Sequence, residues 1–327
     1  MDENKSIVSS HADSDSIDLE HLFHQIETNR SMREVRQMEK AKKTVSLVEA
    51  DSIINSSDEA AQIIYNRIMQ GDITGDADDY HNISVSFSRR QQHKKAADIC
   101  KKGLELWPDD IDLNADLLTY LMDSGDIASA NIQADQLEKN CPDRTKWNWR
   151  AFRFLFGYYM EARPKGYLEK VEKLVEDYKT ILPWDEKAYR CAADLYEHKG
   201  DINSAISILE EGISNLNAPQ CALRLADIYF EQAKYEDVIR VSTLGIAYAA
   251  EPQPGIRTAY LLFLRALSKD ARYLKNGALS VEEGNRIIKE YELAMKYVSA
   301  REKEIIKQRI DILQVYSGNG VITSSNE

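Results

Sequence analysis

The sequence has little cysteine, proline and glycine, and these shortages exclude several classes of protein. Its 327 residues include 4 Cys, 7 Pro and 14 Gly, too few for a disulfide scaffold, a collagen-like fibre or a low-complexity chain. No apolar run approaches the roughly 18 residues that a membrane-spanning helix needs. The polar start MDENKSIVSS is unlike a secretory signal. We therefore expect a folded, mostly helical protein that does not associate with membranes.

Positive charge is also in short supply. The chain has 42 Lys and Arg against 54 Asp and Glu, a formal net charge of -12. An acidic surface disfavours non-specific binding to nucleic acid or to an anionic membrane. The cysteines are far apart and form no Cys-x-x-Cys pair, which is typical of reduced thiols inside cells; they are Cys100, Cys141, Cys191 and Cys221. We predict a cytoplasmic protein.

Motifs that carry catalysis are missing as well. The sequence contains no GxxxxGK[ST] phosphate loop, no GxGxxG and no GxSxG. His21 and His24 share a helical spacing but lack a third ligand, so solvated histidines are favoured over a metal site. The cysteines have no activating neighbours in the sequence. We expect no catalytic, metal-binding or cofactor-binding residues, and no enzyme.

The chain does contain a sequence repeat: the pattern of one helical hairpin occurs twice between residues 77 and 142. Apolar and small residues with helical spacing recur about 34 residues later, and a proline closes each copy. The first copy carries Tyr80, Ile83, Ser84, Phe87, Ala96, Cys100, Gly103 and Pro108. The second carries Asn114, Leu117, Leu118, Leu121, Ala130, Ala134, Leu137 and Pro142. A period of this length predicts an array of two-helix repeats.

Helix boundaries carry signals of their own. Ser57 and the acidic pairs at 78–79 and 109–110 lie near expected helix starts, where such side chains act as caps. Gly125 and Gly200 are expected in the turn between the two helices of a repeat, where a left-handed residue helps the chain to reverse.

This pattern resembles the tetratricopeptide repeat. The resemblance is good over 77–142 and 186–250 and looser over 146–183 and 257–299, where the third unit is about seven residues longer. It implies an all-α fold, a right-handed α-solenoid of tetratricopeptide-type helical hairpins. We predict a disordered tail at 1–16, an N-terminal helical arm at 17–56, a solenoid of five to six repeats with a C-terminal capping helix at 57–316, and a frayed end at 317–327. A sixth repeat is expected to be interrupted near 268–284.

The resemblance also implies that the first helix of each repeat lines a concave face where peptides bind. Recurrent arginine on successive first helices is the main electrostatic contrast in this acidic chain. A guanidinium suits carboxylates and phosphates because it donates two parallel hydrogen bonds. We expect these inward-facing residues to receive an acidic or C-terminal peptide segment: Arg150, Arg190, Asp194, Arg224, Asp227 and Arg265. The alternative is that they form ordinary ion pairs along each helix.

The third repeat has a heavily aromatic first helix. Its aromatic residues either fill the core of the stretched unit or form an exposed docking patch, for which the candidates are Trp147, Trp149, Phe154 and Tyr158. A chaperone-type carboxylate clamp is not predicted, because the corresponding positions hold His81, Val85 and Thr119.

Three functions remain open on the sequence. The leading one is a non-catalytic adaptor or scaffold that binds a protein or peptide through the concave face. The second is a regulatory subunit that docks by its N-terminal arm or by its aromatic third repeat. The third, nucleic-acid binding, is disfavoured by the charge and has only the lysine pairs at 42–43, 94–95 and 101–102 in its support. Self-association of the array stays open.

Overall fold

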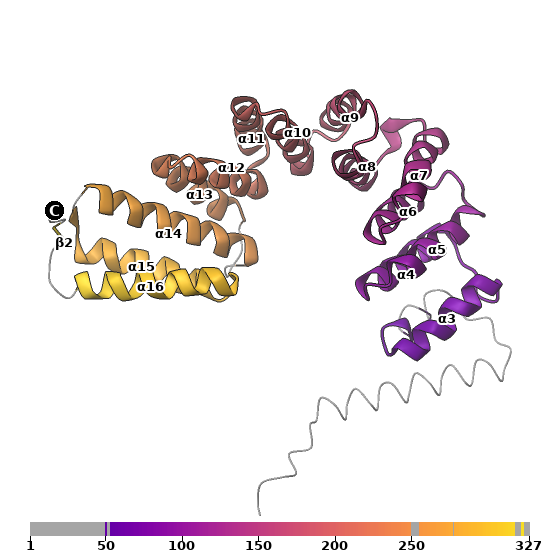
Figure 1. The fold of residues 1–327 in the computed structure, drawn as a ribbon, viewed down its shortest axis with the longest axis horizontal. Helices are drawn as coiled ribbons and strands as arrows, with labels where there is room; N and C mark the ends of the chain where they lie inside the picture. Colours follow the sequence, from indigo (N-terminus) through magenta and orange to yellow (C-terminus); the bar gives the residue numbers. More distant parts are fainter. Residues whose placement is uncertain (1–49, 51–52, 250–254, 277, 318–321, 324–327) are drawn as a thin grey trace, which may run out of the picture. The chain divides into compact units, whose positions relative to one another are not determined.

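The computed structural model describes residues 50, 53–249, 255–276, 278–317 and 322–323, and these residues are almost entirely helical (Figure 1). The chain divides into two units, one ending at Pro142 and one beginning at Asp143. The predicted tail at 1–16, most of the predicted arm at 17–56 and most of the predicted frayed end at 317–327 lie outside the described residues, as do His21, His24 and the lysines at 42–43.

The first unit is a stack of helices in chain order. Its helices are α3 (Asp58–Gln70), α4 (Ala77–Arg89), α5 (His93–Leu104), α6 (Ile111–Asp123) and α7 (Ile127–Asn140). Helix α6 begins one repeat length after α4, and α7 begins the same length after α5. All the helical positions that define the two sequence copies are buried, from Tyr80 to Leu137. The repeat predicted from the sequence is therefore the packing unit of the fold.

Acidic and hydroxyl side chains start the helices of the first unit. Ser57 caps α3 by accepting a hydrogen bond from the backbone N–H of Ala60. Asp76 and Asp79 form a reciprocal capping box at the start of α4, and Asp110 accepts from the N–H of Leu113 at the start of α6. Each cap satisfies a backbone donor that has no partner within its helix. The capping roles predicted for Ser57, Asp79 and Asp110 are confirmed.

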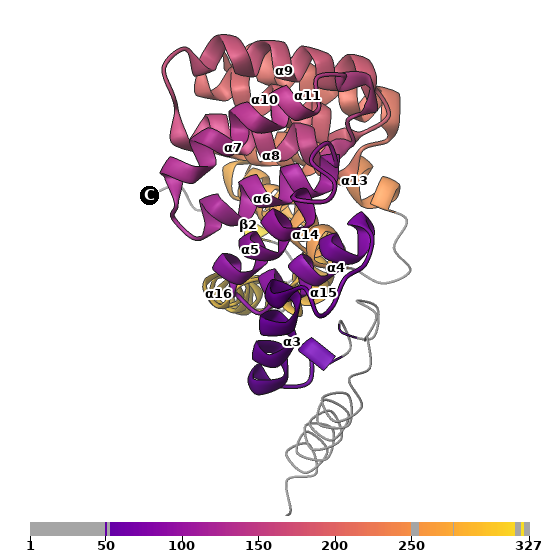
Figure 2. The ribbon, with the colours of Figure 1, turned by 90° about the vertical axis from the view of Figure 1, so that its right-hand side faces the viewer.

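The second unit contains α8 (Trp149–Ala162), α9 (Tyr167–Ile181), α10 (Glu186–His198), α11 (Ile202–Leu216), α12 (Pro219–Glu231), α13 (Tyr235–Ala249), α14 (Ile256–Asn276), α15 (Val281–Met295) and α16 (Ala300–Ser317). Each helix packs against the next (Figure 1), and Figure 2 shows the same helices after a turn of 90°. In addition, α8 packs on α10, α10 on α12 and α12 on α14. The first helices of successive hairpins therefore lie side by side and form one surface.

A left-handed residue occupies the same place in the turn of four hairpins, and the α8–α9 turn has two at other places, Arg163 and Gly166. Gly125 and Gly200 have φ of 77° and 78°, as predicted for these turns, while Gln91 and Ala233 hold the equivalent places with φ of 60° and 54°. A residue with a Cβ is disfavoured in this conformation by about 1–2 kcal/mol. Two of the four turns thus keep the left-handed geometry without glycine.

The extra residues of the third repeat are divided between two places. Helix α8 begins four residues later than the repeat period predicts from α6, and α10 begins three residues later than it predicts from α8. A short 3₁₀ turn, Arg144–Lys146, occupies the first insertion. Trp147 was predicted to lie in the first helix of this repeat, but it precedes α8 because that turn delays the start of the helix. The division of the insertion also decides which side chains of α8 face the neighbouring helix α10.

The C-terminal part differs from the prediction in one element and confirms another. The interruption expected from residue 268 is wrong, since α14 continues to Asn276 and the break before α15 is short. There, Ala278–Leu279 (β1) pairs antiparallel with Ile322–Thr323 (β2). The capping helix is confirmed as α16, which packs on α15 and buries Ile306 and Leu313.

Candidate functional site

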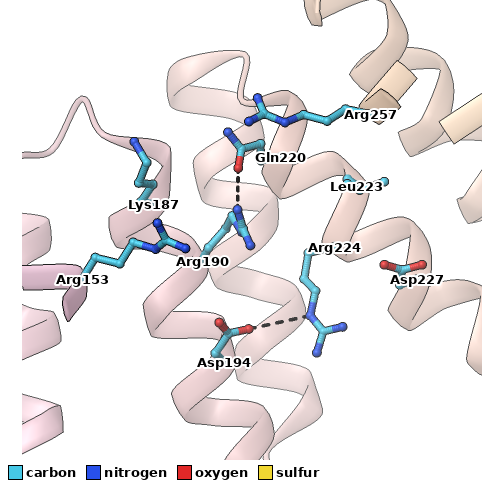
Figure 3. Close-up of a pocket in the computed structure, with 9 residues that line it drawn as sticks. All are labelled: Arg153, Lys187, Arg190, Asp194, Gln220, Leu223, Arg224, Asp227 and Arg257. Atoms are coloured by element: carbon cyan, nitrogen blue, oxygen red, sulfur yellow. Dashed lines mark hydrogen bonds and ion pairs between the residues drawn. The ribbon is translucent and has the colours of Figure 1, made fainter. Parts of the chain in front are cut away.

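A pocket of about 600 Å³ lies on the surface formed by the first helices of the second unit. Helices α8, α10, α12 and α14 each contribute to it, and among the described residues no second helix of a hairpin does. Its lining residues are Arg153, Lys187, Arg190, Asp194, Gln220, Leu223, Arg224, Asp227 and Arg257 (Figure 3). Pockets that bind small ligands have volumes of about 300–1,000 Å³. The pocket is therefore large enough to receive several ligand atoms or part of a peptide.

Local helix signals place these side chains. Asp185 caps α10 by accepting from the N–H of Lys187, and Pro219 occupies the first position of α12. The N–H of Gln220 donates to Glu186 at 3.1 Å, which ties the start of α12 to the start of α10. The starts of the two helices are thereby aligned, so residues at equivalent helix positions line the pocket at the same level.

Four cations gather at one end of the pocket, which we call the basic end: Arg153, Lys187, Arg190 and Arg257. Figure 3 shows Arg153 extending toward Arg190, and Arg257 toward Gln220. Arg190 donates a hydrogen bond to the neutral amide oxygen of Gln220. Lys187 lies 3.7 Å from Asp185 and 4.2 Å from the ring centroid of Trp149. Within the part of the chain that the structure describes, Arg153 and Arg257 form no ion pair.

Two cations of the basic end lie at helix N-termini, where the helix dipole is also positive. Lys187 and Arg257 stand at the second position of α10 and α14, and α14 has no acidic residue in its first turn. A helix N-terminus carries a partial positive charge, so cations there are unfavourable by a few tenths of a kcal/mol and anions are favourable. An anionic group bound at this end would be attracted both by the side chains and by the helix ends.

Two carboxylates, Asp194 and Asp227, line the other end, which we call the acidic end. The guanidinium of Arg224 lies between them (Figure 3). Arg224 donates to Glu197 from Nε at 3.0 Å and from Nη2 at 2.6 Å, and its Nε lies 3.7 Å from Asp194. One arginine is thus shared by several carboxylates, and its stronger bonds go to Glu197.

Burial perturbs the acidic end. It raises the pKa of Asp194 above the usual value, while the positive charges of Arg224 and Arg190 act in the opposite direction. Burial also raises the pKa of Asp227, against a hydrogen bond from Tyr260 and the charge of Arg224. Both carboxylates are therefore less favourable as anions than they would be in water.

The structure brings together four of the six residues predicted to face inward. Arg190, Asp194, Arg224 and Asp227 all line the pocket. Arg265 does not, because it pairs with Glu290 at 2.9 Å and donates to Thr243 at 3.1 Å. Arg150 is also outside the lining and lies 5.5 Å from the ring centroid of Trp149 on its own helix. The predicted intrahelical pairs are replaced by the interhelical pair of Arg224 with Glu197.

Sequence reasoning missed Arg153, Lys187, Gln220, Leu223 and Arg257. Because part of the extension lies between the starts of α8 and α10, the counterpart of Arg190 on α8 is Arg153, and the counterpart of Lys187 is Arg150. The sequence prediction set the register by the small residue at each close-packed position and so selected Arg150 instead. A search one helical turn before Arg190 and Arg224, three and four residues earlier, would have found Lys187 and Gln220.

The aromatic patch is only partly accessible. Trp147 and Tyr158 are buried, 2% and 4% exposed, so they are wrong as members of an exposed docking surface. Trp149 and Phe154 are half-buried and pack edge to face, with ring centroids 6.3 Å apart. Since Lys187 contacts Trp149, this aromatic pair borders the basic end of the pocket. A more exposed tryptophan, Trp184 at 70%, lies between α9 and α10 and was missed because it is outside the helical pattern.

The cysteines and the lysine pair at 101–102, which the sequence analysis also considered, do not line the pocket. All four cysteines are buried, and burial raises the pKa of Cys141 to about 11 and that of Cys191 and Cys221 to about 12. Lys101 and Lys102 lie near Asp98 and Glu105, at 3.7 and 2.6 Å. None of the helices described is long and apolar enough to cross a bilayer.

A stack of two-helix hairpins whose first helices line a pocket defines a helical-repeat protein. Yeast Tom70 is similar in structure, with a TM-score of 0.55 and 13% identity over 89% of this chain and 59% of that one. Pseudomonas aeruginosa PilF is similar too, with a TM-score of 0.50 and 16% identity over 71% of this chain and 96% of that one. A TPR protein of Thermus thermophilus has a TM-score of 0.44 and 17% identity over 60% and 98%.

The similarities to Tom70 and PilF show the fold, a helical solenoid of the tetratricopeptide-repeat type, as the sequence predicted. No protein-family model and no curated protein matches the sequence.

Proposed function

We propose that this protein is a non-catalytic adaptor that binds an acidic segment of a partner protein in the pocket of the second unit. The observation that carries the proposal is the basic end: four cations line one side of one pocket, and two of them form no ion pair among the described residues. Positive charges held close together repel one another, and a bound anion relieves this repulsion. Carboxylates of a peptide are the natural ligands for such a fork of guanidinium groups.

The charge of the whole molecule makes local recognition necessary. With a net charge of -12, the protein repels an acidic peptide at long range. Binding must therefore come from the cations of the pocket and must weaken as salt screens them. The half-buried pair Trp149 and Phe154 beside Lys187 offers an apolar contact for a neighbouring side chain of the same peptide. The four buried free thiols suit a reducing compartment, and we place the adaptor in the cytoplasm.

The experiment compares two triple variants for binding of a fluorescein-labelled peptide that carries a cluster of glutamates. The first variant, Arg153→Gln, Lys187→Gln and Arg257→Gln, removes three charges from the basic end. The control, Lys173→Gln, Lys289→Gln and Lys307→Gln, removes three exposed charges that do not line the pocket. Arg224 is left intact, since its loss would leave Glu197 without its ion-pair partner. Circular dichroism checks that both variants are folded.

We expect the pocket variant to bind the peptide about 10- to 100-fold more weakly than the wild type by fluorescence anisotropy, if each charge contributes about 0.5–1 kcal/mol. The control should bind within about twofold of the wild type. Equal weakening in both variants would mean that only the net charge matters. No binding by the wild type, or no difference between the variants, would overturn the proposal.

A further inference from the structure

We propose that the pocket recognises two charges of opposite sign on one peptide: an anionic group at the basic end and a cationic side chain about three residues away at the acidic end. This inference rests on the proposed function and deepens it by stating which sequence the peptide carries. It comes from the acidic end, which a site for a purely acidic peptide would not need.

The acidic end takes a carboxylate from each of two neighbouring helices. On α10, Lys187 and Arg190 in the first half are followed by Asp194 and Glu197 in the second half. On α12, the neutral Gln220 at the start is followed by Arg224 and Asp227. Because α10 packs directly on α12, the two halves meet side by side and the pocket has one basic and one acidic end.

The acidic end remains negative after its internal pairing is counted. Three carboxylates, Asp194, Glu197 and Asp227, surround the single guanidinium of Arg224. Arg224 gives its two shorter contacts to Glu197, and Asp227 accepts a hydrogen bond from the neutral phenol of Tyr260. The side chain of Asp194 is 41% exposed, so a ligand cation can reach it. A ligand cation placed here would be attracted by two carboxylates whose negative charge is only partly neutralised.

The distance between the two ends sets the spacing of the ligand charges. Lys187 and Asp194 are seven residues apart on α10, as are Gln220 and Asp227 on α12, which corresponds to roughly 10 Å along a helix axis. A peptide in the polyproline II conformation advances about 3.1 Å for each residue and, with three residues per turn, directs every third side chain to the same side. Two side chains of a ligand that are three residues apart would therefore reach the two ends together, whereas adjacent side chains would not.

The test uses peptides that differ only in the presence and position of one lysine. All are fluorescein-labelled, carry two glutamates and have a neutral background. One has no lysine, one has lysine beside the glutamates, and two have lysine three residues away on either side. We expect one of the two spaced isomers to bind about fivefold more tightly than the isomer with adjacent lysine, in line with a partly exposed ion pair.

The variant Asp194→Asn with Asp227→Asn serves as the matched control for the acidic end. It should lose the preference for the spaced isomer while binding the lysine-free peptide at least as well as the wild type does. Equal binding of the adjacent and spaced isomers, or a preference that survives in this variant, would overturn the inference.

The two proposals fail in different ways. If the wild type binds the lysine-free peptide and the triple variant of the basic end binds it more weakly, the adaptor proposal stands, whichever lysine isomer binds best. If the wild type binds none of the peptides, both proposals fall. A thermal melt of each variant ensures that a loss of binding does not come from a loss of folding.

Discussion

Arg309 on α16 donates two hydrogen bonds to Asp270 on α14, from Nε to Oδ2 at 2.6 Å and from Nη2 to Oδ1 at 2.7 Å. The hydroxyl of Tyr291 on α15 donates to the same carboxylate at 3.3 Å. The Asp270 side chain is only 4% exposed. One buried carboxylate thus joins the last three helices, and this contact fixes the capping helix to the repeat that it covers.

We predict that Arg309→Met detaches the capping helix. The substitution leaves a buried carboxylate without its cation, a change that typically costs about 3–5 kcal/mol. Hydrogen exchange followed by mass spectrometry should show faster exchange over residues 300–317, and the midpoint of urea unfolding should fall. Lys307→Met, an exposed change on the same helix, is the control. Adding Asp270→Asn should restore part of the lost stability; equal exchange in the Arg309→Met and Lys307→Met variants would contradict the prediction.

We predict opposite effects for two glycine-to-alanine changes. A Cβ at Gly212 on α11 would lie 2.9 Å from Sγ of Cys221 and 3.1 Å from Cβ of Tyr189. Overpacking of this kind destabilises a protein by about 1–3 kcal/mol, which exceeds the roughly 1 kcal/mol gained from helix propensity. A Cβ at Gly157 on α8 would meet nothing within 4 Å, so there the propensity gain should be seen. Urea unfolding measures both; a stable Gly212→Ala variant would show that α11 and α12 can move apart.

We predict a pH-dependent gain in stability from Asp227→Asn. The folded-state pKa of Asp227 is raised, whereas the unfolded value is about 3.9, so the folded protein binds this proton more tightly. The resulting stabilisation is complete below the unfolded pKa and is lost as the pH rises through the folded one. The wild type therefore carries an unfavourable charge at pH 7, and Asp227→Asn should be more stable than the wild type there.

The difference between Asp227→Asn and the wild type should disappear near pH 3, below the unfolded pKa of about 3.9, where the carboxylic acid is protonated in both the folded and the unfolded protein. Urea midpoints at the two pH values provide the measurement. Glu176→Gln, at an exposed position of α9 outside the pocket, should show no such dependence. A gain from Asp227→Asn that is the same at both pH values would argue against a titration effect.

The sequence predicted the fold well because the signals for helices and turns are local. Positions one repeat apart, such as Ala96 and Ala130, are equivalent because each hairpin repeats the same close contact, and both are fully buried. Gly125 and Gly200 marked two turns correctly. The extent of α14 was missed because the polar stretch after Ser268 does not look apolar enough for a buried helix, although Asp270 is buried there through its bonds to Arg309.

The candidate site was predicted only in part, because it depends on offsets between helices. Arg150 and Arg153 lie three residues apart on α8, and the offset between the starts of α8 and α10 places Arg153, not Arg150, opposite Arg190 in the pocket lining. Whether a charged residue is paired also depends on neighbouring helices: Arg265 looked equivalent to Arg224, but its partner Glu290 comes from α15. No periodicity within one helix carries that information.

By itself, the sequence determined that this chain folds as a stack of tetratricopeptide-type hairpins, because its apolar residues recur with the period of the helix and of the repeat. Only the tertiary structure decided that Arg153 and Lys187 join Arg190 at one end of a pocket and that Trp147 is buried. The physical reason is that helix formation follows from neighbours along the chain, whereas exposure and charge pairing follow from how one helix is set against the next.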